Sequence, residues 1–508
     1  MNILTSTTVF SFYTMLSRVL GYFRDILIAI FLGTSIYADA FFVAFRLPNT
    51  FRRLFAEGTF NAAFIPSYTA ERIKGKTQGK RFADEVLTLL ILGLLTIVLV
   101  VEIFTPYVVY LIAPGFIDDS TKFNLAVDFT RITFPFLAFV SLSSFFAGIL
   151  NSENKFAAAA AAPIFLNLIL ILSLIISYYF KLDYALNLSY GVSLSGLVQL
   201  IFLIFFASKY YNPSLVFKNK LRKKVKFFLN KLLPSIFSSG VIQISILVGT
   251  IIASFQSGAV SYLYYADRIY QINLAIAGIA VSTVSLPVLS KLIKNKKIGQ
   301  ANKIQNKSIE LSLLLSLPAS IALIIGSEEI VNALFGYGSF TKNDIEQTSL
   351  ALKYFGYGIP AFAVLKIFAN FFFARDNTIL PFKVSSAVVL INIAVSILFF
   401  KKIGFIIIPI ATTLSTWVGV FYYLYLLLKI GYLKIESKLY INFTKIVFAT
   451  SVMSYIFIKS LNYFAKNLTY SSDYKILYLL IIVIFVALMY FLICYFLKLL
   501  SIKSFKTN

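Results

Sequence analysis

Histidine is absent from this chain of 508 residues, and cysteine occurs once, at Cys494. Without histidine the chain has no imidazole that could bind a metal or act as an acid or base near neutral pH. A single cysteine excludes an intramolecular disulfide. We therefore expect no metal site, and nothing in the chain indicates a cofactor.

Charged residues are also scarce. They make up 13% of the chain, whereas 59% of its residues are hydrophobic. A soluble globular domain is nearer one quarter charged and one half apolar. Short loops between long apolar runs leave no room for a sizeable soluble domain. The first residues lack the basic region and cleavage site of a signal peptide, so we expect the first span to be retained. The sequence predicts an all-α polytopic membrane protein.

We expect about 14 transmembrane helices, because each crossing of the hydrocarbon core needs about 20 residues. An internal repeat divides them: Pro135 matches Pro360, and Asn167 matches Asn392 at the same offset. Parallel repeats are typical of transporters. The predicted organisation is an N-lobe of six helices at 1–207, a cytoplasmic basic or amphipathic linker at 208–230, a pseudo-symmetric C-lobe of six helices at 231–430, and two further helices with a cytoplasmic tail at 431–508.

The net charge of +25 comes mostly from lysines in loops on one side of the predicted membrane. Because basic loops stay in the cytoplasm, both termini are expected there, and no nucleic-acid partner is expected. The basic segment 209–231 also carries apolar residues. It fits either an amphipathic helix on the anionic leaflet or a solvated linker between the lobes.

Residues 17–66 combine apolar runs with many charges. A charge at bilayer depth costs about 2.5–3.5 kcal/mol, so it is tolerated where it faces protein, water or a charged ligand. We interpret this stretch as the lining of a polar cavity, although some of its arginines fit helix ends from which they snorkel, namely Arg46 and Arg53. The charges are Arg18, Arg24, Asp25, Asp39, Arg46, Arg52, Arg53 and Glu57.

Helical spacing predicts which of the first charges share a face of their helix. Arg18, Gly21 and Asp25 share one stripe of a helix, and Ser17 and Arg24 share the neighbouring stripe. We therefore expect both arginines to face the same side. Gly21 lies between them and leaves room for the backbone of another helix.

The second half supplies Asp267 and Arg268 in the apolar context SYLYYADRIYQ. By the repeat, they lie across the pseudo-symmetry axis from the charges of the first half. Ion pairs that lock the helices are one interpretation, but a buried pair is weak evidence of stability. The excess of arginine favours an anionic ligand in a central cationic cavity, since guanidinium binds phosphate through two parallel hydrogen bonds. The converging arginines are Arg18, Arg24, Arg52 and Arg268.

The motifs ADAFFVAFRLPN and RRLFAEGTFNAAFIP, followed later by YYADRIYQ and LPVLS, closely resemble the MviN/MurJ-type lipid II flippases of the multidrug/oligosaccharidyl-lipid/polysaccharide exporter superfamily. The resemblance implies two lobes around a cationic cavity that opens alternately to either side. It implies substrate-binding roles for Arg18, Arg24, Arg52, Arg268 and Asp39, and roles in the gates for Gly21, Asp25 and Glu57, to which we add Asp267.

The function implied is transport of lipid II, the undecaprenyl-pyrophosphate-linked peptidoglycan precursor, from the cytoplasmic to the periplasmic leaflet of the bacterial inner membrane. No bond is broken, so the chain is not expected to be an enzyme. Expected partners are lipid II, membrane lipids and cell-wall synthesis proteins. The polyprenyl tail is expected in a groove of the last two spans, lined from residues 446–458 and 476–496. Residues 232–254 contain no acid, which argues against a carboxylate sodium site there.

Other functions remain as alternatives. A relative that exports another polyprenyl-linked glycan would have a similar cavity, whereas an exporter of cationic drugs should have an acidic one. A membrane enzyme that acts on polyprenyl phosphates would need a carboxylate cluster or a histidine. An ion channel is disfavoured because no filter-like repeat is present.

For the gate, we expect Asp25 or Asp39 to pair with Arg268 in one closed state.

Overall fold

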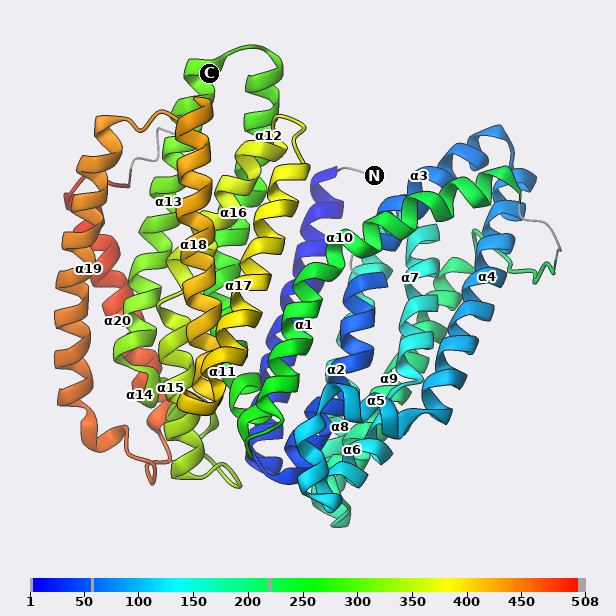
Figure 1. Cartoon of the computed structure of the whole chain (residues 1–508), viewed down its shortest axis with the longest axis horizontal. Coiled ribbons are helices and arrows are strands. Elements are labelled where there is room, and N and C mark those ends of the chain that lie inside the picture. The colour runs from blue at the N-terminus through cyan, green and yellow to red at the C-terminus, as the bar shows by residue number, and fades with distance from the viewer. Residues whose placement is uncertain (1–2, 56–58, 218–221, 501–508) are drawn as a thin grey trace. The chain divides into compact units, whose positions relative to one another are not determined.

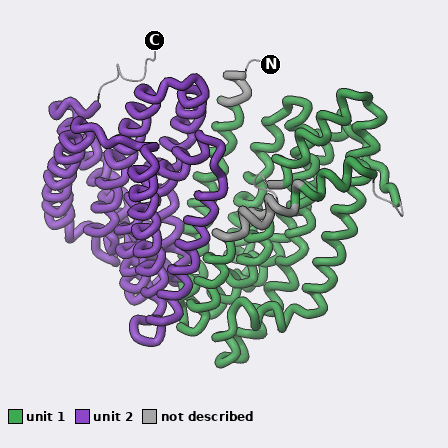
Figure 2. The backbone as a smooth tube through the Cα atoms, turned by 45° about the horizontal axis from the view of Figure 1, so that its top comes forward, with its two compact units in different colours: residues 1–261 green, residues 262–508 purple. Residues whose placement is uncertain are grey.

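The computed structural model describes residues 3–55, 59–217 and 222–500, which form helices joined by short turns, with no strand among them (Figure 1). They divide into two compact units, Met1–Ser261 and Tyr262–Asn508 (Figure 2). The predicted all-helical class is confirmed. Ten helical stretches of the described chain are long and apolar enough to cross a membrane. The count of fourteen spans stays a prediction.

Unit 1 is built from the first ten α-helices and one short 3₁₀ segment. They are α1 (Ile3–Leu32), α2 (Ile36–Phe55), α3 (Thr59–Lys74), α4 (Lys76–Ile103), α5 (Thr105–Ile112), η1 (Pro114–Asp118), α6 (Ser120–Thr133), α7 (Phe136–Ser152), α8 (Phe156–Phe180), α9 (Tyr184–Ala207) and α10 (Lys223–Ala253). The next helix, α11 (Ala259–Leu274), begins in unit 1 and runs on into unit 2.

Unit 2 continues from α11 through a π-helical segment, η2 (Ala275–Ala280). Its other elements are α12 (Val281–Lys294), α13 (Ile298–Ile325), α14 (Ser327–Phe335), α15 (Lys342–Gly356), α16 (Ile359–Phe373), α17 (Ile379–Ile403), η3 (Gly404–Ile406), α18 (Ile407–Ile430), α19 (Ser437–Tyr463), η4 (Ala465–Asn467) and α20 (Lys475–Phe496).

Aromatic side chains dominate the core of unit 1 at one end of α3. Phe64 stacks on Phe60 and Tyr68 with ring centroids 5.2 and 5.6 Å apart, and it also contacts Phe145 of α7. Phe228 of α10 packs edge-on against Phe60, with centroids 5.8 Å apart. The start of α10 is therefore part of the unit 1 core. The predicted lobe ranges describe the internal repeat and stay a prediction.

The segment before α10 is held against α4 by buried polar groups. Asp84 accepts hydrogen bonds from the hydroxyl of Tyr211 at 2.7 Å and from the backbone N–H of Ser214 at 3.0 Å. Glu85 accepts one from Nε of Arg222 at 2.6 Å. Burial and the Asp84 hydrogen bond raise the pKa of the Tyr211 phenol. Residues 209–217 form no helix, so the amphipathic helix considered for this segment is not formed over them.

Unit 2 has its own apolar core between α12, α13, α16 and α18. Phe372 of α16 stacks on Tyr423 of α18 with ring centroids 5.6 Å apart. The last two helices attach along α13, where Glu310 accepts a hydrogen bond from the Asn442 amide at 2.9 Å and Leu314 accepts one from the Tyr490 hydroxyl at 2.7 Å. α19 and α20 therefore form a helical hairpin that packs on α13 within unit 2.

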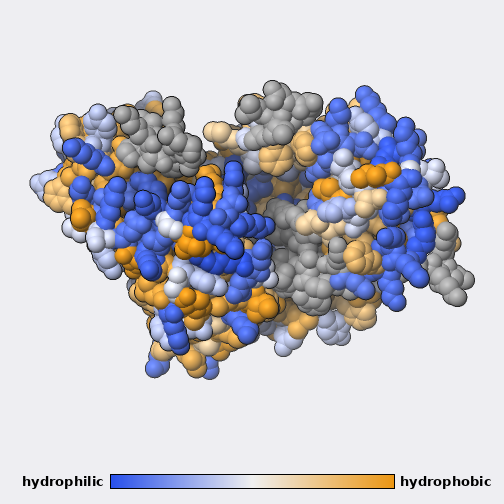
Figure 3. All heavy atoms as spheres, turned by 90° about the horizontal axis from the view of Figure 1, so that it is seen from above, coloured by the Kyte–Doolittle hydropathy of each residue, from blue (hydrophilic) through white to orange (hydrophobic). Residues whose placement is uncertain are grey.

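Lysines gather at one end of each unit. Hydrophilic residues cover much of the face seen from above in Figure 3. The α3–α4 corner carries the basic cluster of unit 1, and the α12–α13 corner carries the basic cluster of unit 2. Both corners were predicted to be cytoplasmic. Their exposed basic residues are Lys74, Lys76, Lys80 and Arg81 in unit 1, and Lys291, Lys294, Lys296 and Lys297 in unit 2.

Candidate functional site

Arg24 is buried inside unit 1 about two turns before the end of α1. Arg24 is 4% exposed and Asp25 is 2% exposed. The Arg24 guanidinium donates to Oδ1 of Asp25 from Nη2 at 2.6 Å and from Nε at 3.0 Å, and its Nη1 donates to Oδ1 of Asn167 at 2.9 Å. These charge-assisted bonds fix the plane of the guanidinium.

Asn167 of α8 connects this arginine to the preceding turns of α1. Its Nδ2 donates to the backbone oxygen of Ser17 at 2.8 Å, while its Oδ1 accepts from Arg24. The predicted shared stripe of Ser17 and Arg24 is confirmed, because one amide contacts both. A Cβ at Gly21 would lie 3.4 Å from Oδ1 of Asn167. Gly21 thus lets α8 approach α1 at the level of the buried arginine.

The two arginines of α1 do not share an environment. Arg18 is exposed, whereas Arg24 is buried. The expectation that they face the same side was wrong, because six residues rotate a helix by about 240°, which separates the two side chains by about one third of a turn. Arg18 therefore stays a predicted substrate residue on a different face of α1.

Asp39, in the first turn of α2, is fully buried and bonded on both oxygens. Its Oδ2 accepts from Nζ of Lys122 at 2.5 Å and from the backbone N–H of Gly258 at 3.0 Å. Its Oδ1 accepts from the backbone N–H of Ser261 at 3.0 Å and from the Ser261 hydroxyl at 2.6 Å. In this structure the carboxylate caps the start of α11. Its predicted contact with substrate is untested.

The acids predicted to pair with Arg268 have other partners here. Asp25 is bonded to Arg24 beside it in α1, and Asp39 is bonded to Lys122 of α6. Both contacts lie within unit 1. A pairing switch with Arg268 stays a prediction for another conformational state.

The other predicted residues of the first half are only partly described. Arg52 of α2 is partly buried, and its Nε donates to Oδ1 of Asn49 at 3.0 Å. Glu57 lies outside the described residues, and so does the side chain of Arg53. Pro48 lies inside α2, so the helix continues through the proline that separates Arg46 from Arg52.

In unit 2, Arg268 of α11 lies against Tyr264 one turn earlier. Its Nη2 donates to the tyrosine hydroxyl at 2.9 Å, and its guanidinium carbon is 4.7 Å from the ring centroid. Asp267 accepts a hydrogen bond from the Gln271 amide. The convergence of Arg268 with the arginines of unit 1 stays a prediction.

Sequence reasoning missed the structural roles of three polar residues. Asn167 was recognised only through its repeat partner, and Lys122 resembled a loop residue beside Asp118 and Asp119.

Lys366, the third of these residues, stands alone in the apolar run of α16. It is exposed, and its Nζ makes no hydrogen bond or ion pair within the part of the chain that the structure describes. An isolated lysine inside a predicted span was the signal that could have indicated it.

The described residues offer no candidate metal site. Among the described ranges, no group of three or more His, Cys, Asp or Glu residues is placed to hold a metal ion.

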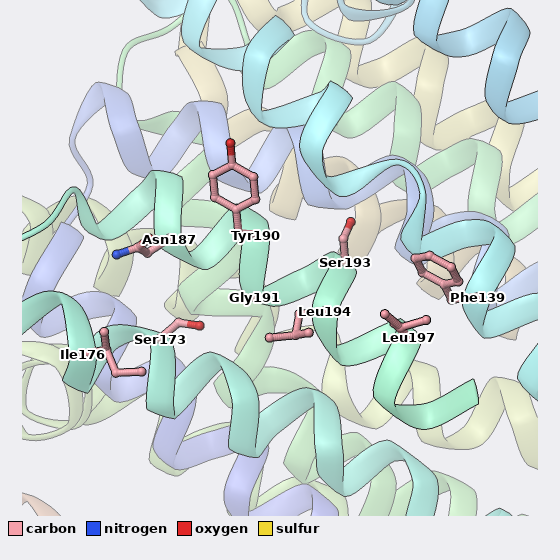
Figure 4. A pocket seen from close by; sticks show the side chains of 9 residues that line it. All are labelled: Phe139, Ser173, Ile176, Asn187, Tyr190, Gly191, Ser193, Leu194 and Leu197. Carbon is pink, nitrogen blue, oxygen red and sulfur yellow. The ribbon is translucent and has the colours of Figure 1, made fainter. Parts of the chain in front are cut away.

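A pocket of about 500 Å³ lies between α7, α8 and α9 of unit 1 (Figure 4). Tyr190, Leu194 and Ile176 line it and are also exposed on the surface of the unit. The other lining residues are Phe139, Ser173, Asn187, Gly191, Ser193 and Leu197. None of these residues is charged, so this pocket lacks the cations that an anionic headgroup needs.

Comparison with known proteins decides the family. The family model described as "Lipid II flippase MurJ" matches residues 28–479. This chain belongs to the MurJ family. A relative named "Probable lipid II flippase MurJ" from Rhizobium meliloti is 39% identical over 87% of this chain and 83% of its own length. One of the same name from Rickettsia prowazekii is 36% identical over 92% of each chain.

Solved structures agree with this membership. The structure titled "Lipid II flippase MurJ, inward closed conformation" superposes with a TM-score of 0.81 at 27% identity, covering 97% of this chain and 99% of that one. An inward-facing multidrug transporter of the MATE family superposes with a TM-score of 0.67 at 15% identity, covering 84% of this chain. The second likeness shows that the two chains share a fold.

Proposed function

We propose that this protein is a lipid II flippase, which moves the undecaprenyl-pyrophosphate-linked peptidoglycan precursor from the cytoplasmic to the periplasmic leaflet. Membership of the MurJ family supports this proposal most strongly. The cationic residues in its membrane helices fit an anionic substrate, since charges at bilayer depth mark the path of a transported group.

In this proposal the arginines bind the pyrophosphate. Arg18, Arg52 and Arg268 contact the headgroup, and Arg24 joins them from α1. Asn167 orients the Arg24 guanidinium through its hydrogen bond, while Asp25 masks the guanidinium in an ion pair that the substrate displaces. A planar guanidinium that is already oriented loses little side-chain entropy when it binds phosphate oxygens. Gly21, Asp25, Glu57 and Asp267 act in the gates.

The polyprenyl tail remains in a hydrophobic environment while the headgroup crosses. We assign it to the α19–α20 hairpin, whose outward side chains include exposed Phe448, Tyr455, Phe485 and Leu488. Headgroup and tail then take separate routes, and the two lobes rock to expose the headgroup site to either side. No covalent step is needed, so the protein acts as a transporter rather than an enzyme.

We place the protein in the bacterial inner membrane with both termini in the cytoplasm. The lysine-rich corners of α3–α4 and α12–α13 support this orientation, because basic loops stay on the cytoplasmic side. A cysteine introduced beside Lys223 should be protected from an impermeant thiol reagent in intact cells, while one beside Asp118 should react. The reverse pattern would exclude this orientation.

The proposal is tested by complementation. The chain is expressed in a bacterium depleted of its own lipid II flippase, and survival is scored with Arg268→Ala as the inactive control. Survival with the wild-type chain only is expected. Failure of a well-expressed wild-type chain, together with transport of another polyprenyl-linked glycan by purified protein, would favour the alternative substrate.

A further inference from the structure

The turn between α10 and α11 is docked onto the rest of unit 1 by backbone contact. The backbone N–H of Gly115 donates to the Ser254 hydroxyl at 3.0 Å. A Cβ at Gly115 would lie 2.5 Å from the Cα of Phe255 and 2.5 Å from the backbone oxygen of Ser254. Only glycine allows the α5–α6 connection to lie this close to the turn.

The same turn is also held by Asp39. The carboxylate accepts the backbone N–H groups of Gly258 and Ser261, each at 3.0 Å. Gly258 has φ +73°, a conformation that glycine adopts readily. A side-chain oxygen that accepts N–H groups at the first turn is the usual helix cap, and here it comes from a distant helix instead of the capping position itself.

Lys122 supplies the charge that balances this buried cap. Its Nζ lies 2.5 Å from Oδ2 of Asp39, and the two side chains are 5% and 0% exposed. The ammonium also lies 4.2 Å from the ring centroid of Phe116. The nearby Asp119 is engaged elsewhere, since its Oδ1 accepts the backbone N–H of Lys122 and caps α6.

We propose that Lys122 is a positioning residue of the transporter, which holds the start of α11 in unit 1 by neutralising Asp39. Without the ammonium, the carboxylate would be a buried charge that helix N–H groups satisfy only in part. Asp267 and Arg268 lie further along the same helix. The docking of its first turn therefore sets the position of Arg268, a predicted headgroup residue. This inference rests on the proposed function for its effect on transport, but not for its structural part.

Release of the turn can be measured directly with a thiol reagent. Val260 is 1% exposed, and Cys494 is fully buried, so the wild-type chain is the unlabelled background. In purified full-length protein in nanodiscs, Val260→Cys should react slowly. Adding Lys122→Met should raise the labelling rate about tenfold, which corresponds to about 1.4 kcal/mol. Exposed Ser257→Cys is the matched control and should react at the same rate with and without Lys122→Met.

Two further variants separate the ion pair from a general loss of packing. Asparagine caps helices about as well as aspartate, so Asp39→Asn combined with Lys122→Met keeps the cap and removes both charges. This double variant should label more slowly than Lys122→Met alone. Gly115→Ala pushes the turn away without changing any charge, so it should raise labelling and should not be rescued by Asp39→Asn.

Equal labelling of Val260→Cys with and without Lys122→Met would overturn the proposal. So would a double variant that labels as fast as Lys122→Met. If Lys122→Met does not accumulate in the membrane, recovery of protein by the double variant supports the ion pair, and failure to recover contradicts it.

Transport of lipid II in reconstituted vesicles gives the second readout. Lys122→Met and Gly115→Ala should both slow transport, because both reduce the population in which the start of α11 is docked. Faster labelling with unchanged transport would refute the positioning role while leaving the flippase proposal intact. Absence of transport in the wild-type chain would refute the flippase proposal and leave the labelling result standing.

Discussion

Asn167→Ala tests whether the orientation of Arg24 matters for transport. The Asn167 amide makes hydrogen bonds that alanine cannot make. It accepts one from the Arg24 guanidinium at 2.9 Å, and it donates to the Ser17 backbone oxygen at 2.8 Å and to the Ser17 hydroxyl at 3.3 Å. A hydrogen bond to a charged group contributes about 1.5–3 kcal/mol in water-soluble proteins. Hydrogen bonds between membrane helices contribute about 0.6 kcal/mol each on average. We therefore expect a loss of about 1–3 kcal/mol in the contact between α1 and α8.

The chain supplies a matched control in Asn392, the repeat partner of Asn167. Asn392 lies in α17 of unit 2, where its Nδ2 donates to the Thr412 hydroxyl at 3.3 Å and its Oδ1 accepts from Ser396 at 3.2 Å. Asn392→Ala also removes amide hydrogen bonds inside a membrane helix. The bonds to Thr412 and Ser396 are both made with hydroxyl groups.

Both variants should be purified, and their melting temperatures and lipid II transport in reconstituted vesicles compared with those of the wild-type chain. The two variants should lower the melting temperature by similar amounts. Transport should fall at least about fivefold in Asn167→Ala, as expected for about 1 kcal/mol, and stay near the wild-type rate in Asn392→Ala. Equal transport by the two variants would refute the idea that Asn167 acts through Arg24.

Three further predictions concern the charges of the membrane helices. Arg24→Ala should abolish transport at near-normal abundance, and Arg24→Lys should leave a partial defect because lysine lacks the bidentate fork; disappearance of both variants from the membrane would identify Arg24 as a structural lock. Asp25→Asn should retain or tighten lipid II binding while slowing transport, and loss of binding in step with transport would contradict a gating role. The exposed cation of Lys366 in α16 is a further candidate for headgroup contact, so Lys366→Met should weaken lipid II binding, whereas Lys402→Met at the end of α17 should not; equal binding by both would show that Lys366 has no headgroup contact.

Sequence reasoning succeeded where the determining property is local. The apolar composition predicted membrane helices, and the spacing of Ser17 and Arg24 predicted their shared face, because helix periodicity depends only on neighbouring residues. The same periodicity was applied too loosely to Arg18, which lies on another face of α1.

The partners of the buried charges could not be predicted in this way. Nothing in the sequence around Asp39 indicates Lys122, and nothing around Arg24 indicates Asn167, since each pair is brought together by the packing of separate helices. A lysine in a loop and a lysine in a buried ion pair have the same local signature. The distinction depends on which carboxylate lies within hydrogen-bond distance.

The sequence by itself determined the class of this protein: a chain with so many apolar residues and a basic excess in its loops must fold in a membrane, and its motifs identify the MurJ family. Tertiary structure alone decided how the charges are used. It bonded Arg24 to Asp25 and Asn167, and it made Asp39 a cap for α11. The physical reason is that a buried charge must find its partner across helices, and only the packing of those helices selects which partner is in reach.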